Sequence, residues 1–221
     1  GFSCLVEGTE KTIVFDVGGE GSILLSNMEE LGIDPRVVDG VVLSHIHNDH
    51  IGGLDRFLDQ NDNVTVYIPA SFPASVRRKI TDTNADLVEV DGSLRICPNV
   101  HSTGQLGKSI REQSLVIETV KGPVVITGCA HPGVVNIARK AREIAGSDVY
   151  LILGGFHLSG HSSPEINEIV EDLRDLNVRK VAPCHCSGDL ARELFERAYT
   201  EDFIPAGVGK EITIQSAFSR D

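Results

Sequence analysis

Five apolar, β-branched segments of this 221-residue chain each lead directly into a side chain that can ionise or bind a metal. Segments of this composition are typical of buried strands. The side chains that follow them are, in chain order, Asp16, His45, His131, His157 and His185. Because buried strands hold the residues at their ends rigidly, we expect these five to converge on one site. The fold must therefore bring several strand ends together.

The pattern of apolar residues predicts strands mainly in the first half of the chain and an alternation of helices and strands in the second. The last two helices have recognisable start signals. One is Ser163 before Pro164, with Glu165 following, and the other is the segment 187–189. This mixture favours layered α/β packing over an all-β sandwich, and we expect a single domain over residues 1–221. The predicted strands are 12–17, 37–43, 64–68, 114–119, 124–127, 149–153 and 179–182, and the predicted helices are 133–145, 164–176 and 189–199.

Composition excludes several classes of protein. The net charge of −12 argues against nucleic acid as a partner, and no segment has the length and hydropathy of a membrane span. We therefore expect a soluble, cytoplasmic protein that has no membrane partner. Five cysteines in a chain without secretory features indicate free thiols rather than a disulfide framework. The strand-like opening of the chain also leaves room for a further strand before residue 1.

The stretch LSHIHNDHIGG, residues 43–53, contains the densest group of candidate metal ligands, His45, His47, Asp49 and His50. Imidazole and carboxylate are common ligands of zinc. His45 and His47 alternate along the chain and so can point the same way, whereas Asp49 and His50 can turn toward a second cation. The alternative is a capped, solvated loop, but three histidines and an aspartate in this order favour metal binding.

SHIHNDHIGG, together with TIVFDVGG before it, resembles the metal-binding signature and the preceding strand and turn of the metallo-β-lactamase superfamily. The resemblance implies a four-layered αββα sandwich with the metals at one edge. It also implies that His45 and His47 bind a first metal and that Asp49 and His50 bind a second, which His185 in VAPCHC completes. The superfamily includes hydrolases, nucleases, oxidoreductases and a few transferases.

Two histidines are candidates for the remaining metal ligand. His101 has the chain order of the usual third histidine, whereas His131 lies two residues after the position where most members have an aspartate that bridges the metals. In this chain that position is Cys129. A thiolate can ligate or bridge, but a cysteine among apolar residues is more often simply packed.

Three later segments together resemble a subgroup typified by archaeal dihydropterin synthases of the methanopterin pathway. They are VVITGCAHPGVVNI, LGGFHL and APCHCSGDLA. In that subgroup the histidine of GC-x-H-P-G joins the metal site, which favours His131 over His101. The resemblance implies a transferase that joins a dihydropterin methyl diphosphate to a ribofuranosyl-aminobenzene 5'-phosphate with loss of pyrophosphate. The alternatives are a hydrolase of phosphodiester, thioester or lactone bonds and a metal-binding sensor without catalytic activity.

Asp49 and His157 are the candidate catalytic residues. Asp49 can orient a nucleophile, and His157 in GGFHLSG can act as a general acid or hold a phosphate, although a structural histidine at a strand end is the alternative. The expected cofactors are divalent metal ions, zinc first, although manganese, iron and magnesium are also candidates. We expect a phosphorylated small-molecule substrate, toward which Lys108 and Arg111 would supply positive charge.

One further expectation concerns Cys184 and Cys186. If the last strand continues into its turn, alternation places both cysteines on one side and His185 on the other.

Overall fold

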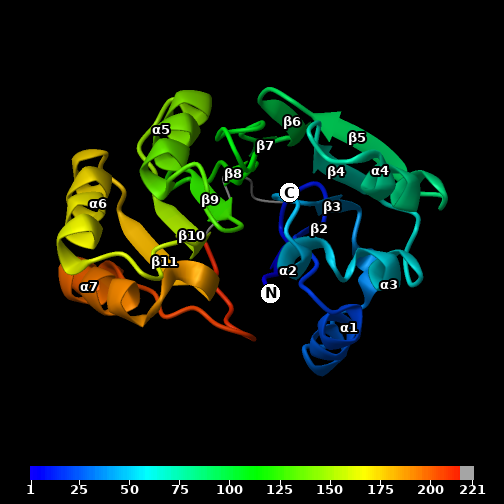
Figure 1. Ribbon diagram of the computed structural model, residues 1–221, viewed down its shortest axis with the longest axis horizontal. Coiled ribbons are helices and arrows are strands. Elements are labelled where there is room, and N and C mark those ends of the chain that lie inside the picture. Colours follow the sequence, from blue (N-terminus) through cyan, green and yellow to red (C-terminus); the bar gives the residue numbers. More distant parts are fainter. Residues whose placement is uncertain (215–221) are drawn as a thin grey trace.

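Two β-sheets lie face to face in the computed structural model, which describes residues 1–214 (Figure 1). The first sheet has the strand order β1-β2-β3-β4-β5, and β2 to β5 run parallel to one another. Its strands are β1 Cys4–Val6, β2 Ile13–Phe15, β3 Gly40–Val42, β4 Thr65–Pro69 and β5 Asp86–Val90.

The second sheet has the order β11-β10-β9-β8-β7-β6. Strands β9, β10 and β11 are parallel, whereas β6 to β9 form an antiparallel meander. Its strands are β6 Leu94–Cys97, β7 Val100–Ser102, β8 Leu115–Ile117, β9 Val124–Thr127, β10 Leu151–Gly155 and β11 Lys180–Cys184.

Helices cover the outer face of each sheet, so that the strands lie between two layers of helices (Figure 1). Helices α1 Gly21–Glu30, α2 Asn48–Ile51, α3 Leu54–Leu58 and α4 Ala74–Thr81 accompany the first sheet. Helices α5 Val134–Ala145, α6 Ser163–Asp175 and α7 Asp189–Tyr199 accompany the second. Within residues 1–214, none of the helices combines the length and the apolar character that a membrane crossing requires.

Alternation of side chains along the strands produces three separate hydrophobic cores. In β2, Val14 packs in the core under the helices of the first sheet, whereas Ile13 and Phe15 pack between the two sheets. In β10, Ile152 packs against the helices of the second sheet, whereas Leu151 joins the core between the sheets. Since successive strand residues point to opposite faces, each central strand serves two cores. The three cores separate four layers, which confirms the αββα sandwich.

Every predicted strand and helix overlaps an observed one, but the predicted ranges leave out strands β1, β5, β6 and β7 and helices α1 to α4. Strand β5 has exposed or half-buried residues at four of its five positions, so it lacks a continuous apolar run. The start of α6 also differs by one residue. Its N-cap is Ser162, whose backbone N–H donates to Glu165 Oε2 at 2.8 Å, and not the predicted Ser163.

The ends of five strands, drawn from both sheets, carry side chains of the candidate site. Asp16 follows β2 and His45 follows β3, which are parallel neighbours in the first sheet. His131, His157 and His185 follow β9, β10 and β11, which are parallel neighbours in the second. Because parallel neighbours end on the same side of a sheet, the topology gathers these side chains.

Candidate metal centre

The segment that follows β3 places four potential ligands within six residues. The chain leaves the strand at Val42, passes through the buried His45 and begins α2 at Asn48, with His47 as its N-cap. Asp49 and His50 lie in this short helix. Gly53 then allows the backbones to approach, since a Cβ there would lie 2.1 Å from the carbonyl oxygen of Val17. The tight turn directs the imidazoles toward the second sheet.

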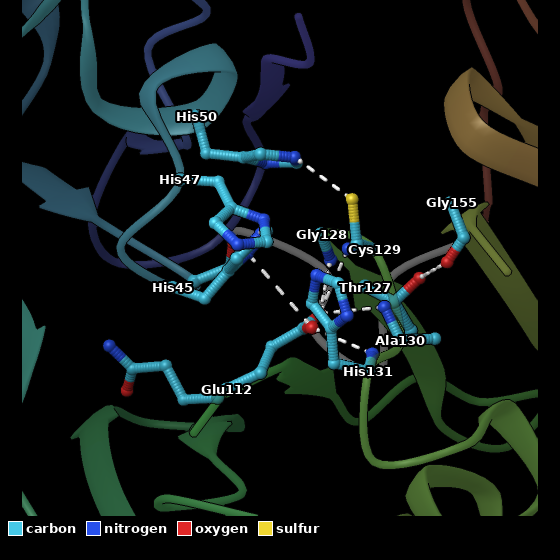
Figure 2. A network of polar contacts seen from close by, with 12 residues as sticks. His45, His47, His50, Glu112, Thr127, Gly128, Cys129, Ala130, His131 and Gly155 are labelled. Atoms are coloured by element: carbon cyan, nitrogen blue, oxygen red, sulfur yellow. Dashed lines mark hydrogen bonds and ion pairs between the residues drawn. The ribbon is translucent and has the colours of Figure 1, made fainter. Parts of the chain in front are cut away.

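His45, His47 and His131 form a first group of donors, in which one ligand atom of each lies within 4.8 Å of the others. Figure 2 shows the three imidazoles beside one another, and each pair of rings packs edge to face. Their ring centroids are 4.7 to 4.9 Å apart, and Nε2 of His45 lies 3.1 Å from Nδ1 of His47. Nε2 of His131 is buried and has no hydrogen-bond partner in the described part of the chain. A buried nitrogen of this kind is the expected form of an imidazole that binds a cation.

Asp49, His50, Cys129 and His185 form a second group. Nε2 of His50 lies 3.2 Å from Nε2 of His185, 3.2 Å from Sγ of Cys129 and 3.4 Å from Oδ2 of Asp49. Oδ2 of Asp49 is also 3.1 Å from Nε2 of His185. The ring centroids of His45 and His50 are 4.2 Å apart, so the first and second groups are adjacent.

Asp16 and Ser44 set the tautomers of the two buried histidines. Oδ2 of Asp16 lies 2.6 Å from Nδ1 of His50 and accepts the Ser44 hydroxyl at 2.7 Å. The Ser44 Oγ is in turn 2.9 Å from Nδ1 of His45 and accepts its proton. Both imidazoles therefore carry a proton on Nδ1 and present a free Nε2 to the donor groups. Burial opposes the charged form of His50, but Asp16 outweighs it and raises the pKa of this imidazole.

The Glu112 carboxylate organises the loop that carries Cys129 and His131 (Figure 2). Its Oε1 accepts the backbone N–H groups of Gly128, Cys129 and Ala130 at 3.1, 3.0 and 2.9 Å, and its Oε2 accepts that of His131 at 2.9 Å. Burial raises the pKa of Glu112 to about 7, against the opposing effect of these N–H groups. Sequence reasoning missed Glu112, for which the only signal was a charged residue just before the strand predicted at 114–119.

Neutral imidazole, the form that binds a cation, is favoured at three of these histidines, whereas Asp16 favours the charged form of His50. Burial and the neighbouring imidazoles lower the pKa of His45 to about 2 and that of His131 to about 4. Burial also lowers the pKa of His185. Imidazole nitrogens, joined in the second group by the Asp49 carboxylate, fit a divalent cation such as zinc in each group.

The structure brings His131, and not His101, to the site. His101 lies in β7, where its Nε2 is 3.0 Å from Oε1 of Glu118. His157 is exposed, and its ring centroid is 4.4 Å from that of His131.

The expectation that Cys184 and Cys186 share one side is wrong. Strand geometry ends at Cys184, and residues His185–Ser187 form a 3₁₀ turn in which His185 has a φ of 53°. Cys184 packs against the core between the sheets, whereas Cys186 lies beside Cys129 and His157. The neighbouring Cys129 thiol lowers the pKa of Cys186 to about 5, and the pKa of Cys129 is raised in turn.

Known proteins resemble this chain over most of its length. The chain is 28% identical to 7,8-dihydropterin-6-methyl-4-(beta-D-ribofuranosyl)-aminobenzene-5'-phosphate synthase of Methanocaldococcus jannaschii, over 96% of this chain and 89% of that protein. The crystal structure of Tm1679, a metal-dependent hydrolase of the beta-lactamase superfamily, has a TM-score of 0.83 and 27% identity, and the match covers 98% of this chain and 92% of that one.

A third likeness concerns the fold alone. The metallo-beta-lactamase fold protein YhfI from Bacillus subtilis has a TM-score of 0.63 and 16% identity, and the match covers 94% of this chain and 90% of that one. The family model of the metallo-beta-lactamase superfamily matches residues 1–185, which include all the histidines of both donor groups. The chain therefore belongs to the metallo-β-lactamase superfamily.

Proposed function

We propose that the protein is a metal-dependent enzyme with two adjacent divalent cations, zinc being the first candidate. His45, His47 and His131 would hold one cation, and Asp49, His50 and His185 would hold the other. The observation that carries this proposal is the 4.2 Å separation of the His45 and His50 rings, which brings the two donor groups into contact. Bound there, the cations supply Lewis acidity and stabilise negative charge that develops on the reacting group.

Asp49 and His157 would do the proton chemistry around this centre. The Asp49 side chain is 46% exposed, so one oxygen can face a ligand while Oδ2 stays beside His50 and His185. A carboxylate in this position can orient a nucleophile and accept its proton. His157 is exposed beside His131, where its imidazole can donate a proton to a leaving oxygen or bind a phosphate.

For the reaction, we propose that the amine nitrogen of a ribofuranosyl-aminobenzene 5'-phosphate attacks the methyl carbon of a dihydropterin methyl diphosphate. A C–N bond forms, the C–O bond to the diphosphate breaks with release of pyrophosphate, and the amine loses a proton to a base such as Asp49. Support comes from the synthase of Methanocaldococcus jannaschii, whose likeness spans nearly the whole of both chains. The segment Leu106 to Glu112 carries the exposed cations Lys108 and Arg111, and a Cβ on its Gly107 would lie 3.5 Å from the ring of Pro132, next to His131. This positive charge suits a phosphorylated substrate.

The second candidate is a hydrolase of phosphodiester, thioester or lactone bonds. It is favoured by the close structural likeness to Tm1679, which is described as a metal-dependent hydrolase. The two candidates share the metal centre and differ in the nucleophile, an aromatic amine in one case and water in the other.

The decisive experiment supplies the metal-loaded protein with the dihydropterin methyl diphosphate and measures pyrophosphate release with and without the aminobenzene phosphate. Release that requires the second substrate, together with formation of the joined product, supports the transferase. Release without it supports hydrolysis. No release in either case contradicts the transferase, and the hydrolase is then tested with phosphodiester, thioester and lactone substrates. His101→Ala, which removes a histidine that pairs with Glu118 and belongs to none of the donor groups, should react as the wild-type protein does.

A further inference from the structure

Beside the proposed pair of cations, a third group of donors consists of Cys129, His157 and Cys186. One ligand atom of each lies within 4.8 Å of the others, and Sγ of Cys186 is 3.7 Å from the carbonyl oxygen of Cys129. The three residues follow β9, β10 and β11, which are adjacent parallel strands. The proposed reaction uses His157 but neither thiol.

The backbone around this group is shaped to admit the two thiols. A Cβ on Gly155 would lie 2.7 Å from Sγ of Cys186 and 3.2 Å from Cα of Cys129, so only glycine leaves them room. His157 has a φ of 53°, a left-handed conformation that is uncommon outside glycine and is frequent at functional sites. The imidazole is exposed, whereas Cys186 is half-buried and Cys129 is buried, so the group opens to solvent on one side.

The donor chemistry of this group differs from that of the other two. Two thiols and one imidazole make a Cys₂His set, which binds zinc and leaves a fourth position open. Thiolates also select soft metals more strongly than imidazole and carboxylate do. Cys129 connects this group to the second one, because its Sγ is 3.2 Å from Nε2 of His50.

We propose that Cys129, His157 and Cys186 form a further cation site for a thiophilic divalent metal such as zinc, adjacent to the proposed pair. The site depends on its own donors and does not require the proposed reaction. Cys184 provides the internal comparison, since it is two residues from Cys186 but packs in the core between the sheets. If Cys186 served only to pack the protein, replacing it would change metal binding no more than replacing Cys184 does.

The test compares Cys186→Ser with Cys184→Ser in the reduced, metal-free full chain, titrated with Zn²⁺ and, separately, with Co²⁺. Thiolate ligation of cobalt produces an intense near-ultraviolet charge-transfer absorption that histidine and carboxylate ligation lack. We expect the wild-type protein and Cys184→Ser to show this absorption. Cys186→Ser should bind one zinc equivalent fewer and show a clearly weaker absorption.

His157→Ala is the second variant, and removal of this exposed side chain leaves the buried cores intact. It should also bind one zinc equivalent fewer than the wild-type protein, with circular dichroism showing an unchanged fold. The proposal is overturned if Cys186→Ser and His157→Ala match the wild-type protein in zinc stoichiometry and cobalt absorption. Because the readout is a difference between variants, it stands even if the protein turns over none of the proposed substrates.

Discussion

Oδ2 of Asp16 lies 2.6 Å from Nδ1 of His50, and both side chains are fully buried. The carboxylate comes from the end of β2 and the imidazole from α2, so this hydrogen bond joins two segments that are 34 residues apart. It holds the His50 proton on Nδ1 and leaves Nε2 free toward Asp49 and His185. Asp16 therefore acts on the candidate metal centre without being one of its proposed ligands.

Asp16→Asn should weaken metal binding. Oδ1 of Asp16 accepts the backbone N–H of Ser44, and Oδ2 accepts the Ser44 hydroxyl and the Nδ1 proton of His50. An asparagine amide must therefore turn its NH₂ toward donors on one of these two sides. An NH₂ that faces Nδ1 of His50 moves the imidazole proton to Nε2 and removes the free lone pair. We expect metal affinity to fall about 10- to 100-fold in competition with a chelator. Asp59→Asn, on the exposed surface, is the control, and wild-type affinity in Asp16→Asn would contradict the proposed role.

Glu112→Gln should destabilise the loop that carries Cys129 and His131. A glutamine oxygen can replace Oε1, but its NH₂ then faces the backbone N–H of His131 and leaves that donor unsatisfied. An unsatisfied buried donor costs about 1 to 3 kcal/mol of unfolding free energy. Denaturant unfolding of the metal-free protein measures this loss apart from metal binding. Glu118→Gln, at a partly exposed carboxylate, should unfold as the wild-type protein does.

The strand ends and the histidine motif could be predicted from sequence because each is a local pattern. His45, His47, Asp49 and His50 lie within six residues, and the apolar runs before His131 and His185 mark buried strands. Strands with mixed exposure gave no such run, which is why β5 to β7 were missed. Periodicity therefore predicted layered α/β packing and the gathering of side chains at strand ends, whereas the four αββα layers were implied by the family resemblance.

Contacts that depend on backbone groups or on the turns after strands could not be predicted in this way. Glu112 serves the site through four N–H groups of residues 128–131, and backbone donors leave no side-chain pattern in the sequence. Cys186 meets Cys129 across β10 because the chain leaves strand geometry at His185, which alternation alone did not predict. These contacts join residues that are far apart in the sequence, so the histidine motif at residues 45–50 does not reveal them.

His47→Ala and His185→Ala should each lower the metal content of the purified protein, one variant for each proposed cation. Each substitution removes one of three proposed ligands, and the remaining two do not close a stable site. Elemental analysis after removal of loosely bound metal measures the loss. His101→Ala should keep the wild-type content, since its imidazole pairs with Glu118 instead. Full metal content in both site variants would contradict the proposed ligand assignment.

Gly155→Ala should destabilise the protein and disturb the thiol pair together. The added Cβ would lie 2.4 Å from the carbonyl oxygen of Gly128 and 2.7 Å from Sγ of Cys186, closer than such atoms approach. Gly128 cannot retreat easily, because its N–H is held by Glu112. We expect a loss of about 1 to 3 kcal/mol of unfolding free energy, typical of overpacking.

Gly92→Ala is the matched control for that substitution. A Cβ on Gly92 meets nothing within 4 Å, and its backbone does not adopt a positive φ. The change should leave stability unaltered or raise it by about 0.4 to 1 kcal/mol through the unfolded chain. Denaturant unfolding compares the two variants, and the cobalt absorption reports the thiols. If Gly155→Ala unfolded with the free energy of the wild-type protein, the close approach of the strand ends around Cys129 and Cys186 would be wrong.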